Sequence, residues 1–135
     1  MTVPDGLATG ARATLRIVVT EADTAVAAGS GDVPVLATPR LLALAEAACV
    51  AAIAPRMTPS LTSVGTAVSL EHRQASPVGA ELDIEAELTE INGSRLVFAF
   101  IARPADDSDQ VIGAGTVERV VVDRERFLAR TANTA

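Results

Sequence analysis

Lysine, tryptophan and tyrosine are absent from this 135-residue sequence, and phenylalanine occurs only three times. Without lysine, the chain cannot form a lysine Schiff base or supply the phosphate-binding lysine of a P-loop. Few aromatic side chains are present to stack on bases, and the formal net charge of −6 repels phosphate backbones. We therefore expect no nucleic acid partner.

Cysteine and histidine are nearly absent too, since each occurs once, as Cys49 and His72. One cysteine cannot form an internal disulfide, and one cysteine with one histidine cannot build the tetrahedral site of a structural zinc ion. The sequence therefore predicts neither a metal site nor a bound cofactor.

Long apolar runs are also lacking. Residues Met1–Arg12 contain Pro4, Gly6 and Gly10 where a secretory signal needs a continuous apolar stretch, so we expect a cytoplasmic protein. The longest apolar run, Leu41–Ala54, is shorter than the roughly 20 residues that span a bilayer, and it contains a glutamate. It predicts a buried helix rather than a membrane segment.

The composition that remains is that of one globular domain. Apolar residues make up 49% of the chain, which is enough to build one core, and the charged fraction of 21% is ordinary for a globular protein. We predict a single domain over residues 1–135, with its core at about residues 12–128 and both ends loose.

The first half of the sequence reads as a strand, a loop and a helix. β-Branched residues favour a strand at Ala13–Thr20, and the loop that follows, as far as Pro34, is a candidate lid. A helix begins at Thr38-Pro39, where threonine can cap free backbone N–H groups and proline fits the first turn, and it ends at Pro55.

The second half alternates between apolar and polar residues, as strands do. The predicted strands cover residues 64–72, 81–88, 95–103 and 110–123, and Asn92-Gly93 is predicted as a tight hairpin turn. In the first of them, Val64, Thr66, Val68, Leu70 and His72 are expected on one face.

This order of elements predicts an α+β protein in which a curved antiparallel sheet wraps around one long buried helix. That arrangement is the hotdog fold. A plain α+β sandwich is the alternative.

Glu46 is the most conspicuous candidate for chemistry, because it is the only charged residue between Arg40 and Arg56. A carboxylate among apolar side chains loses solvation, so it is rarely kept without a partner or a task. The alternative is that Glu46 lies on a solvated helix edge or at a dimer seam. His72, on the apolar face of its strand, is a candidate acid or orienting group, or else a satisfied core histidine.

Several stretches with fixed spacing resemble the fluoroacetyl-CoA thioesterase family, a branch of the hotdog thioesterases, from about Val33 to Phe127. The matching stretches are Ala37-Thr38, Glu46-Ala47-Ala48-Cys49-Val50, Gly65-Thr66-Ala67, His72 and Ile112-Gly113-Ala114-Gly115-Thr116-Val117-Glu118-Arg119. The aliphatic segment Val33–Leu36 departs from the family, because the fluoroacetyl-specific enzyme has a phenylalanine gate there.

The resemblance implies an enzyme that hydrolyses a small or medium acyl-CoA to the free acid and CoA. It implies that Thr38, Glu46 and His72 are catalytic, with Glu46 as nucleophile or general base, and that Gly65 and Arg119 contact the CoA thioester. Because Thr38 and Glu46 lie about 12 Å apart on one helix, we expect sites completed across a homodimer, with tetramers left open. The alternatives are a non-catalytic acyl-CoA-binding protein, a hotdog hydratase or dehydratase, and a scaffold without a ligand.

Overall fold

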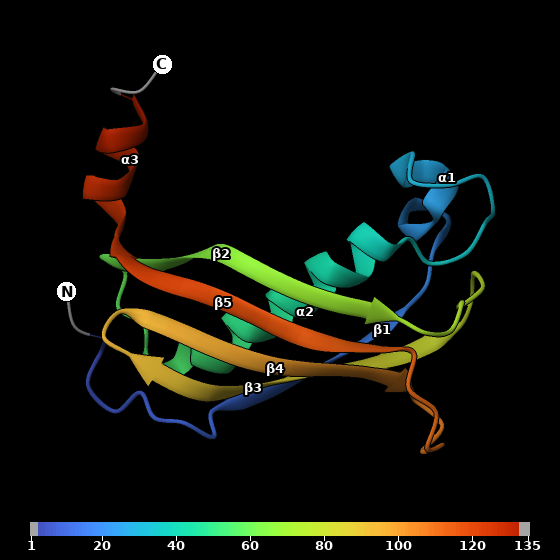
Figure 1. Ribbon diagram of the computed structural model, residues 1–135, viewed down its shortest axis with the longest axis horizontal. Helices are drawn as coiled ribbons and strands as arrows, with labels where there is room; N and C mark the ends of the chain where they lie inside the picture. Colours follow the sequence, from blue (N-terminus) through green and yellow to red (C-terminus); the bar gives the residue numbers. More distant parts are fainter. Residues whose placement is uncertain (1–2, 133–135) are drawn as a thin grey trace.

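The computed structural model describes residues 3–132, and five strands and a long helix organise it (Figure 1). The strands are β1 (Arg12–Val18), β2 (Leu61–His72), β3 (Glu81–Asn92), β4 (Arg95–Pro104) and β5 (Gly113–Asp123). The helices are η1 (Glu21–Asp23), α1 (Ala25–Ala28), α2 (Thr38–Ile53), η2 (Ala54–Arg56) and α3 (Arg124–Ala132). The strands pair antiparallel in the order β1-β3-β4-β5-β2, so β1 and β2 form the two edges of the sheet.

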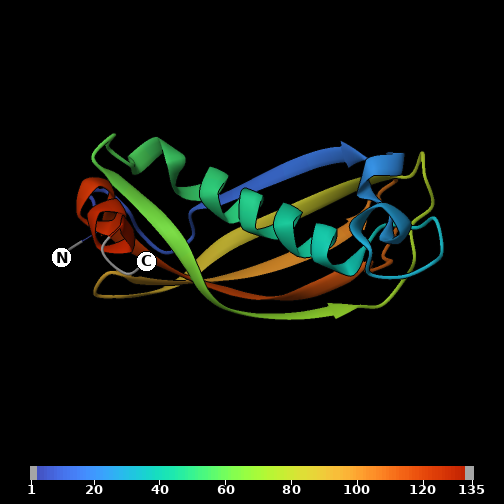
Figure 2. The ribbon, with the colours of Figure 1, turned by 90° about the horizontal axis from the view of Figure 1, so that it is seen from above.

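Helix α2 is the centre of the core, as predicted. The sheet curves around it, and Figure 2 shows the helix lying along the concave side. Its buried side chains are Leu41, Leu44, Ala45, Ala48, Cys49, Ala52 and Ile53. The span Thr38–Arg56 is long and apolar enough by composition to cross a membrane, but this buried face packs mainly against β3 and β1, as in a core helix.

Strand β3 shows the predicted alternation. Leu82, Ile84, Ala86 and Leu88 are buried, and the residues between them face outward. On the outer face, Asp83 pairs with Arg16 of β1 at 2.8 Å, and Glu87 pairs with Arg12 at 2.8 Å. Because these pairs are exposed, they fix the β1–β3 register more than they stabilise the fold.

The β3–β4 hairpin turns one residue later than predicted. Asn92 pairs with Arg95, so Gly93 and Ser94 form the two-residue loop, and Gly93 takes the positive φ of 64°. Asn92 remains in the ladder because glycine adopts this backbone conformation without steric cost.

Strand β2 contains a β-bulge that the alternation did not reveal. Gly65 pairs with Arg119 and Ala67 pairs with Glu118, so Thr66 is the extra residue. A bulge reverses which face successive side chains take. The prediction that one face runs from Val64 to His72 is therefore wrong, because odd-numbered residues before the bulge and even-numbered residues after it face α2.

Contacts on both sides of the bulge show this reversal. Before the bulge, Ser63 and Gly65 lie against the side chain of Arg119 on the face of the sheet toward α2. Val64 lies on the outer face beside Val120. After it, Leu70 packs on the core and His72 bonds to a side chain of α2.

The segment between β1 and α2, predicted as a lid, is tied to the start of α2. The Ala37 N–H donates to the Asp23 carbonyl at 2.9 Å, and the Ala25 N–H donates to the Val35 carbonyl at 2.8 Å. The Arg40 Nε–H donates to the Asp23 carboxylate at 2.8 Å. Burial alone would raise the pKa of Asp23, but this bond and two from Thr20 outweigh it and hold the pKa below 3.8.

The arginine-rich end was predicted to be loose, but residues Arg124–Ala132 form helix α3, which projects from one end of the sheet (Figure 1). Its sequence is mostly polar and no residue in it is buried, which is why a hydrophobic pattern did not reveal it.

Candidate active site

Glu46 lies on α2, and its carboxylate is ion-paired. Arg119 Nη1 donates to Glu46 Oε2 at 2.9 Å, and the glutamate side chain is 33% exposed. The expectation of a partner for this charge is thus met by an arginine from β5. The positive charge of Arg119 thus compensates the carboxylate of Glu46 at the edge of an apolar helix.

Arg119 itself is buried, with 8% of its surface exposed. Its Nε–H donates to Ser63 Oγ at 2.9 Å, and its Nη2 donates to the Ser63 backbone carbonyl at 2.8 Å. The resemblance implied that Arg119 contacts the CoA thioester. In the single chain its guanidinium is directed at Glu46 and Ser63.

Gly65 lies against the same carboxylate. A Cβ built at this position would lie 2.6 Å from Glu46 Oε2 and 3.5 Å from Arg119 Nη1. Only glycine leaves room here for the carboxylate to approach the strand. Glu46, Ser63, Gly65 and Arg119 form one group of contacts, here called the Glu46 cluster.

Thr38 and His72 form a second group, here called the His72 pair. The Thr38 hydroxyl and His72 Nδ1 are 2.8 Å apart. Thr38 was predicted to cap the helix, but the N-cap is Ala37 and Thr38 is the first helical residue. Its hydroxyl is therefore available to the imidazole.

His72 is held in its neutral form. Burial lowers its pKa below the ordinary value of 6.5 and outweighs the nearby Gln74 backbone, which acts to raise the pKa, so the imidazole is uncharged at neutral pH. Its Nε2 is buried and has no hydrogen-bond partner among residues 3–132. A buried ring nitrogen without a partner is one that a ligand can satisfy.

The structure brings the five predicted residues together as two groups rather than one. Thr38 and Glu46 are eight residues apart on α2, which corresponds to about 12 Å along a helix. Within one chain, the Glu46 cluster and the His72 pair therefore lie at separate positions along α2 and do not contact each other.

A cavity of about 280 Å³ opens beside the His72 pair. It is lined by Ala25, Ser30, Gly31, Val33, Val35, Leu36, Thr38, His72, Arg73, Gln74 and Ala75. Most of its apolar wall comes from the segment between β1 and α2, which gives that segment the position expected of a lid.

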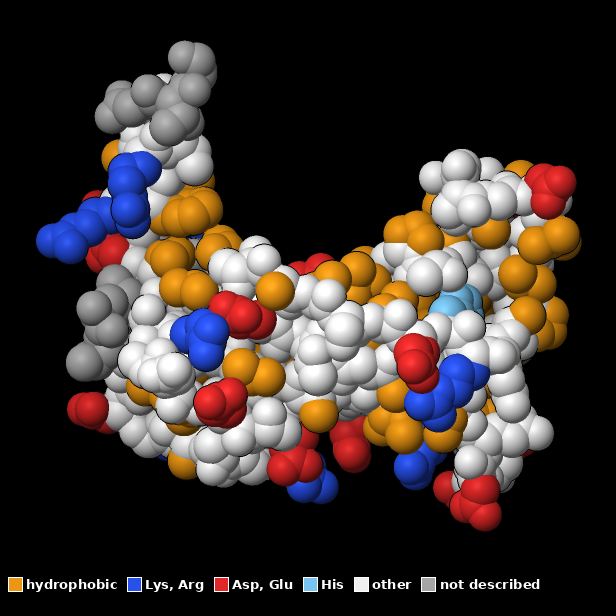
Figure 3. Space-filling model, viewed as in Figure 1, with side chains coloured by type: hydrophobic (Ala, Val, Ile, Leu, Met, Phe, Trp, Pro, Cys, Tyr) orange, Lys and Arg blue, Asp and Glu red, His pale blue; other side chains and the backbone are white. Residues whose placement is uncertain are grey.

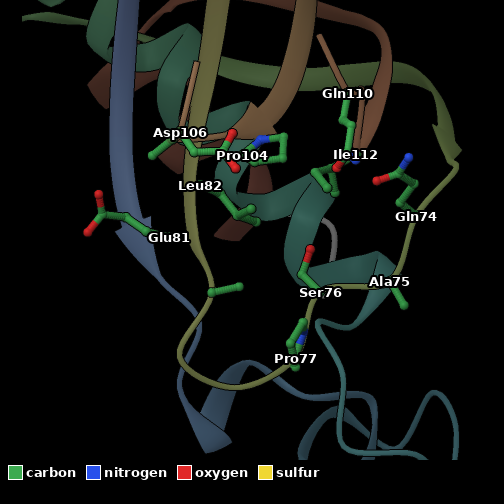
Figure 4. A pocket seen from close by; sticks show the side chains of 12 residues that line it. Gln74, Ala75, Ser76, Pro77, Glu81, Leu82, Pro104, Asp106, Gln110 and Ile112 are labelled. Carbon is green, nitrogen blue, oxygen red and sulfur yellow. The ribbon is translucent and has the colours of Figure 1, made fainter. Parts of the chain in front are cut away.

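A larger cavity, of about 480 Å³, adjoins it and shares Gln74 and Ala75 with it. Figure 4 shows the Ser76 hydroxyl directed toward Leu82 and Ile112 there, and this hydroxyl has no hydrogen-bond partner in the described part of the chain. None of the five predicted site residues lines this larger cavity.

Ser63 is the residue of the Glu46 cluster that sequence reasoning missed. It lies two residues before Gly65 on β2, so it shares the face of that glycine, which is the one signal the sequence offers.

As for metals, residues 3–132 contain no group of three or more His, Cys, Asp or Glu side chains arranged to hold an ion.

Comparison with known proteins points to one family. The family model for fluoroacetyl-CoA-specific thioesterase matches residues 19–125. The fluoroacetyl-CoA thioesterase of Streptantibioticus cattleyicolor is 40% identical over 96 residues, which are 71% of this chain and 67% of that protein.

Solved structures agree. The structure of the fluoroacetyl-CoA thioesterase FlK superposes with a TM-score of 0.88 at 34% identity, covering 97% of this chain and 99% of that one. A hot-dog-like protein from Thermanaerovibrio acidaminovorans has a TM-score of 0.83 at 17% identity, covering 93% and 91% of the two chains. The predicted hotdog fold is confirmed.

Proposed function

The chain belongs to the family of fluoroacetyl-CoA-specific thioesterases and is an acyl-CoA thioesterase; from that premise we propose that Glu46 supplies the reactive oxygen in a site built by two copies of the chain. The observation that carries this proposal is the ion pair that fixes Glu46 beside Gly65 at a sheet edge. The similarity to thioesterases favours hydrolysis over the hydratase and non-catalytic alternatives.

A second copy is needed because the Glu46 cluster and the His72 pair lie apart in one chain. Both adjoin β2, which is an edge strand with exposed residues from Gly65 to Ser69. Figure 3 shows the molecule hollowed above this edge, between α3 and α1. Such an edge is a template for pairing with another strand.

Antiparallel pairing of β2 with β2 of a second copy, about a two-fold axis near Val68, has a useful consequence. Paired positions add to 136 next to the axis, and the extra residue Thr66 lowers the sum to 135 beyond the bulge. Position 63 of one copy then lies opposite position 72 of the other. The Glu46 cluster of one copy thereby meets the His72 pair of the other. The homodimer thus supplies two complete sites.

Two routes to hydrolysis start from this arrangement. In the first, Glu46 takes a proton from water, the water oxygen bonds to the acyl carbon, and the carbon–sulfur bond breaks as the CoA thiolate leaves and takes up a proton. In the second, the Glu46 oxygen bonds to the acyl carbon, the thiolate leaves, and water hydrolyses the resulting anhydride. Both routes consume one water and release one acid and one CoA.

The His72 pair stabilises the charge that develops on the thioester oxygen. A Thr38 hydroxyl that donates to Nδ1 leaves the proton of the neutral imidazole on Nε2. Nε2, buried and without a partner in residues 3–132, then donates to the oxyanion.

The acyl group occupies the cavity of about 280 Å³ beside the His72 pair. Its aliphatic wall, from Val33, Val35 and Leu36, suits a small or medium acyl chain and does not by itself select a fluorinated one.

The test is release of CoA thiol from a panel of acyl-CoAs by the parent protein, Glu46→Gln and His72→Ala. We expect neither variant alone to show steady-state turnover above background. After the two are mixed and allowed to exchange subunits, heterodimers carry one intact site each, so about a quarter of the parent activity returns.

Each part of the proposal can fail separately. Parent-like hydrolysis by Glu46→Gln would exclude the role of that carboxylate. No recovery on mixing, with exchange verified by a mass tag, would mean that each site is built within one chain. Oxygen-18 from labelled water appearing in Glu46 after many turnovers would favour the nucleophilic route over the base route.

A further inference from the structure

Ser63 receives two hydrogen bonds from the guanidinium that holds Glu46. Its side-chain Oγ accepts from Arg119 Nε at 2.9 Å, and its own backbone carbonyl accepts from Arg119 Nη2 at 2.8 Å. The same guanidinium donates from Nη1 to Glu46 at 2.9 Å. One serine therefore occupies one edge of the planar group while the glutamate occupies the other.

This geometry fixes the orientation of Arg119. A guanidinium is planar and its donors point in fixed directions, so two bonds along the Nε–Nη2 edge define the plane and the direction of Nη1. Because Arg119 is 8% exposed, water has little access to replace a lost partner. Removal of the Ser63 hydroxyl leaves a buried Nε–H unsatisfied and leaves a single bond, from Nη2 to the Ser63 carbonyl, to hold that edge, so the plane of the guanidinium is no longer fixed.

The orientation of Arg119 in turn decides where the Glu46 carboxylate sits. Oε2 is taken by Arg119, and no residue among 3–132 donates a hydrogen bond to Oε1. That second oxygen is therefore the one left for water or for the acyl carbon. A rotated Arg119 would let the carboxylate swing on its flexible side chain.

We propose that Ser63 is a positioning residue for the hydrolysis: it locks Arg119, and Arg119 aims Glu46. This inference rests on the proposed role of Glu46 and adds the element that fixes its geometry. It predicts that loss of the Ser63 hydroxyl lowers the rate of the chemical step and leaves acyl-CoA binding nearly unchanged, because Ser63 does not touch the substrate.

The experiment measures kcat and KM for Ser63→Ala, Ser63→Cys and Ser63→Thr with one hydrolysed acyl-CoA. Cysteine keeps the shape of serine but offers only a weak acceptor, whereas threonine keeps the hydroxyl. Ser60→Ala is the matched control, since Ser60 lies just before β2 and its hydroxyl contacts only the exposed Thr58 among the described residues. Thermal unfolding is followed for every variant.

We expect kcat to fall about ten- to hundredfold in Ser63→Ala and Ser63→Cys, with KM within about twofold of the parent. Ser63→Thr should stay within about threefold of the parent, and Ser60→Ala should be unchanged. In a Glu46→Gln background, measured in single turnover, Ser63→Ala should lower the residual rate no further, because the two residues act through one another.

Three results separate this inference from the proposed function. If Glu46→Gln is inactive but Ser63→Ala and Ser63→Cys keep the parent kcat, Ser63 has no positioning role and the function of Glu46 stands. If Ser63→Ala slows Glu46→Gln as much as it slows the parent, Ser63 acts independently of Glu46 and the inference is overturned. If Glu46→Gln is as active as the parent, the proposed function itself fails.

Discussion

Gly65→Ala is the smallest change that should disable the site and leave the fold intact. The new Cβ would lie 2.6 Å from Glu46 Oε2, whereas ordinary contacts begin at about 3.4 Å. The carboxylate must therefore retreat by the difference, 3.4 − 2.6 = 0.8 Å. It cannot do so and keep its 2.9 Å bond to Arg119 unchanged.

The expected loss of activity follows from that displacement. A misplacement of about 1 Å in a reacting group can cost on the order of a hundredfold in rate. We therefore expect kcat/KM to fall about a hundredfold. The stability cost should be about 1 kcal/mol, because the clashing atom is the end of a flexible side chain and Gly65 does not have a positive φ.

The assay is release of CoA thiol, followed together with thermal unfolding. Gly115→Ala is the informative contrast, because its Cβ would overlap the backbone carbonyl oxygen of Ser69, which cannot move alone. It should cost about 3 kcal/mol of stability or more and reduce activity only as the folded fraction falls. Parent-like kcat/KM in Gly65→Ala, with an unchanged melting temperature, would refute the close approach of Glu46 to β2.

Further predictions concern charge and burial. Because burial lowers the pKa of His72, the unfolded chain binds a proton at this imidazole more readily than the folded protein does. The free energy of unfolding should therefore decline as the pH falls through 6.5. Urea unfolding at pH 7.5 and 5.5 measures this decline, and a His72→Gln variant should lack it. Asp23→Asn should lose about 1–3 kcal/mol at pH 7 and loosen the segment between β1 and α2, since the Asp23 carboxylate has a lowered pKa and bonds to Arg40. Equal thermal melts would contradict this. Burial raises the pKa of Cys49 to about 12, so a thiol reagent should label Cys49 only after denaturation. Rapid labelling of the native protein would show that the core is open there.

The elements that rest on short-range pattern could be predicted from the sequence. Leu82 to Leu88 alternate as a half-buried strand must, and Thr38-Pro39 and Pro55 bracket α2. Glu46 stood out because it is a single charge in an apolar helix. Each of these signals depends on residues close together in the chain.

The contacts that build the site could not be predicted in this way. The partnership of Glu46 with Arg119 joins residues 73 positions apart, and that of Arg119 with Ser63 joins residues 56 apart. Both depend on the register between β2 and β5, which no local pattern specifies. Only the resemblance to a family pointed to Arg119, and nothing but its spacing from Gly65 pointed to Ser63.

The bulge at Thr66 is the feature on which both groups depend, and its removal gives a decisive test. With a regular ladder, residues 63 and 72 would face opposite sides of the sheet, because their separation is odd. The extra residue brings Ser63 and His72 to the same side, facing α2. Deletion of Thr66 should therefore abolish either the Glu46 cluster or the His72 pair and lower kcat/KM by at least about a hundredfold.

Thr66→Ala is its control, since it keeps the chain length and loses only an exposed hydroxyl that bonds to the Glu118 carbonyl at 3.3 Å. We expect Thr66→Ala to retain parent activity within about twofold, because an exposed bond of this length adds little. If the deletion variant folds and hydrolyses acyl-CoA as fast as Thr66→Ala, the bulge does not set the faces of β2, and the two groups must be positioned in another way.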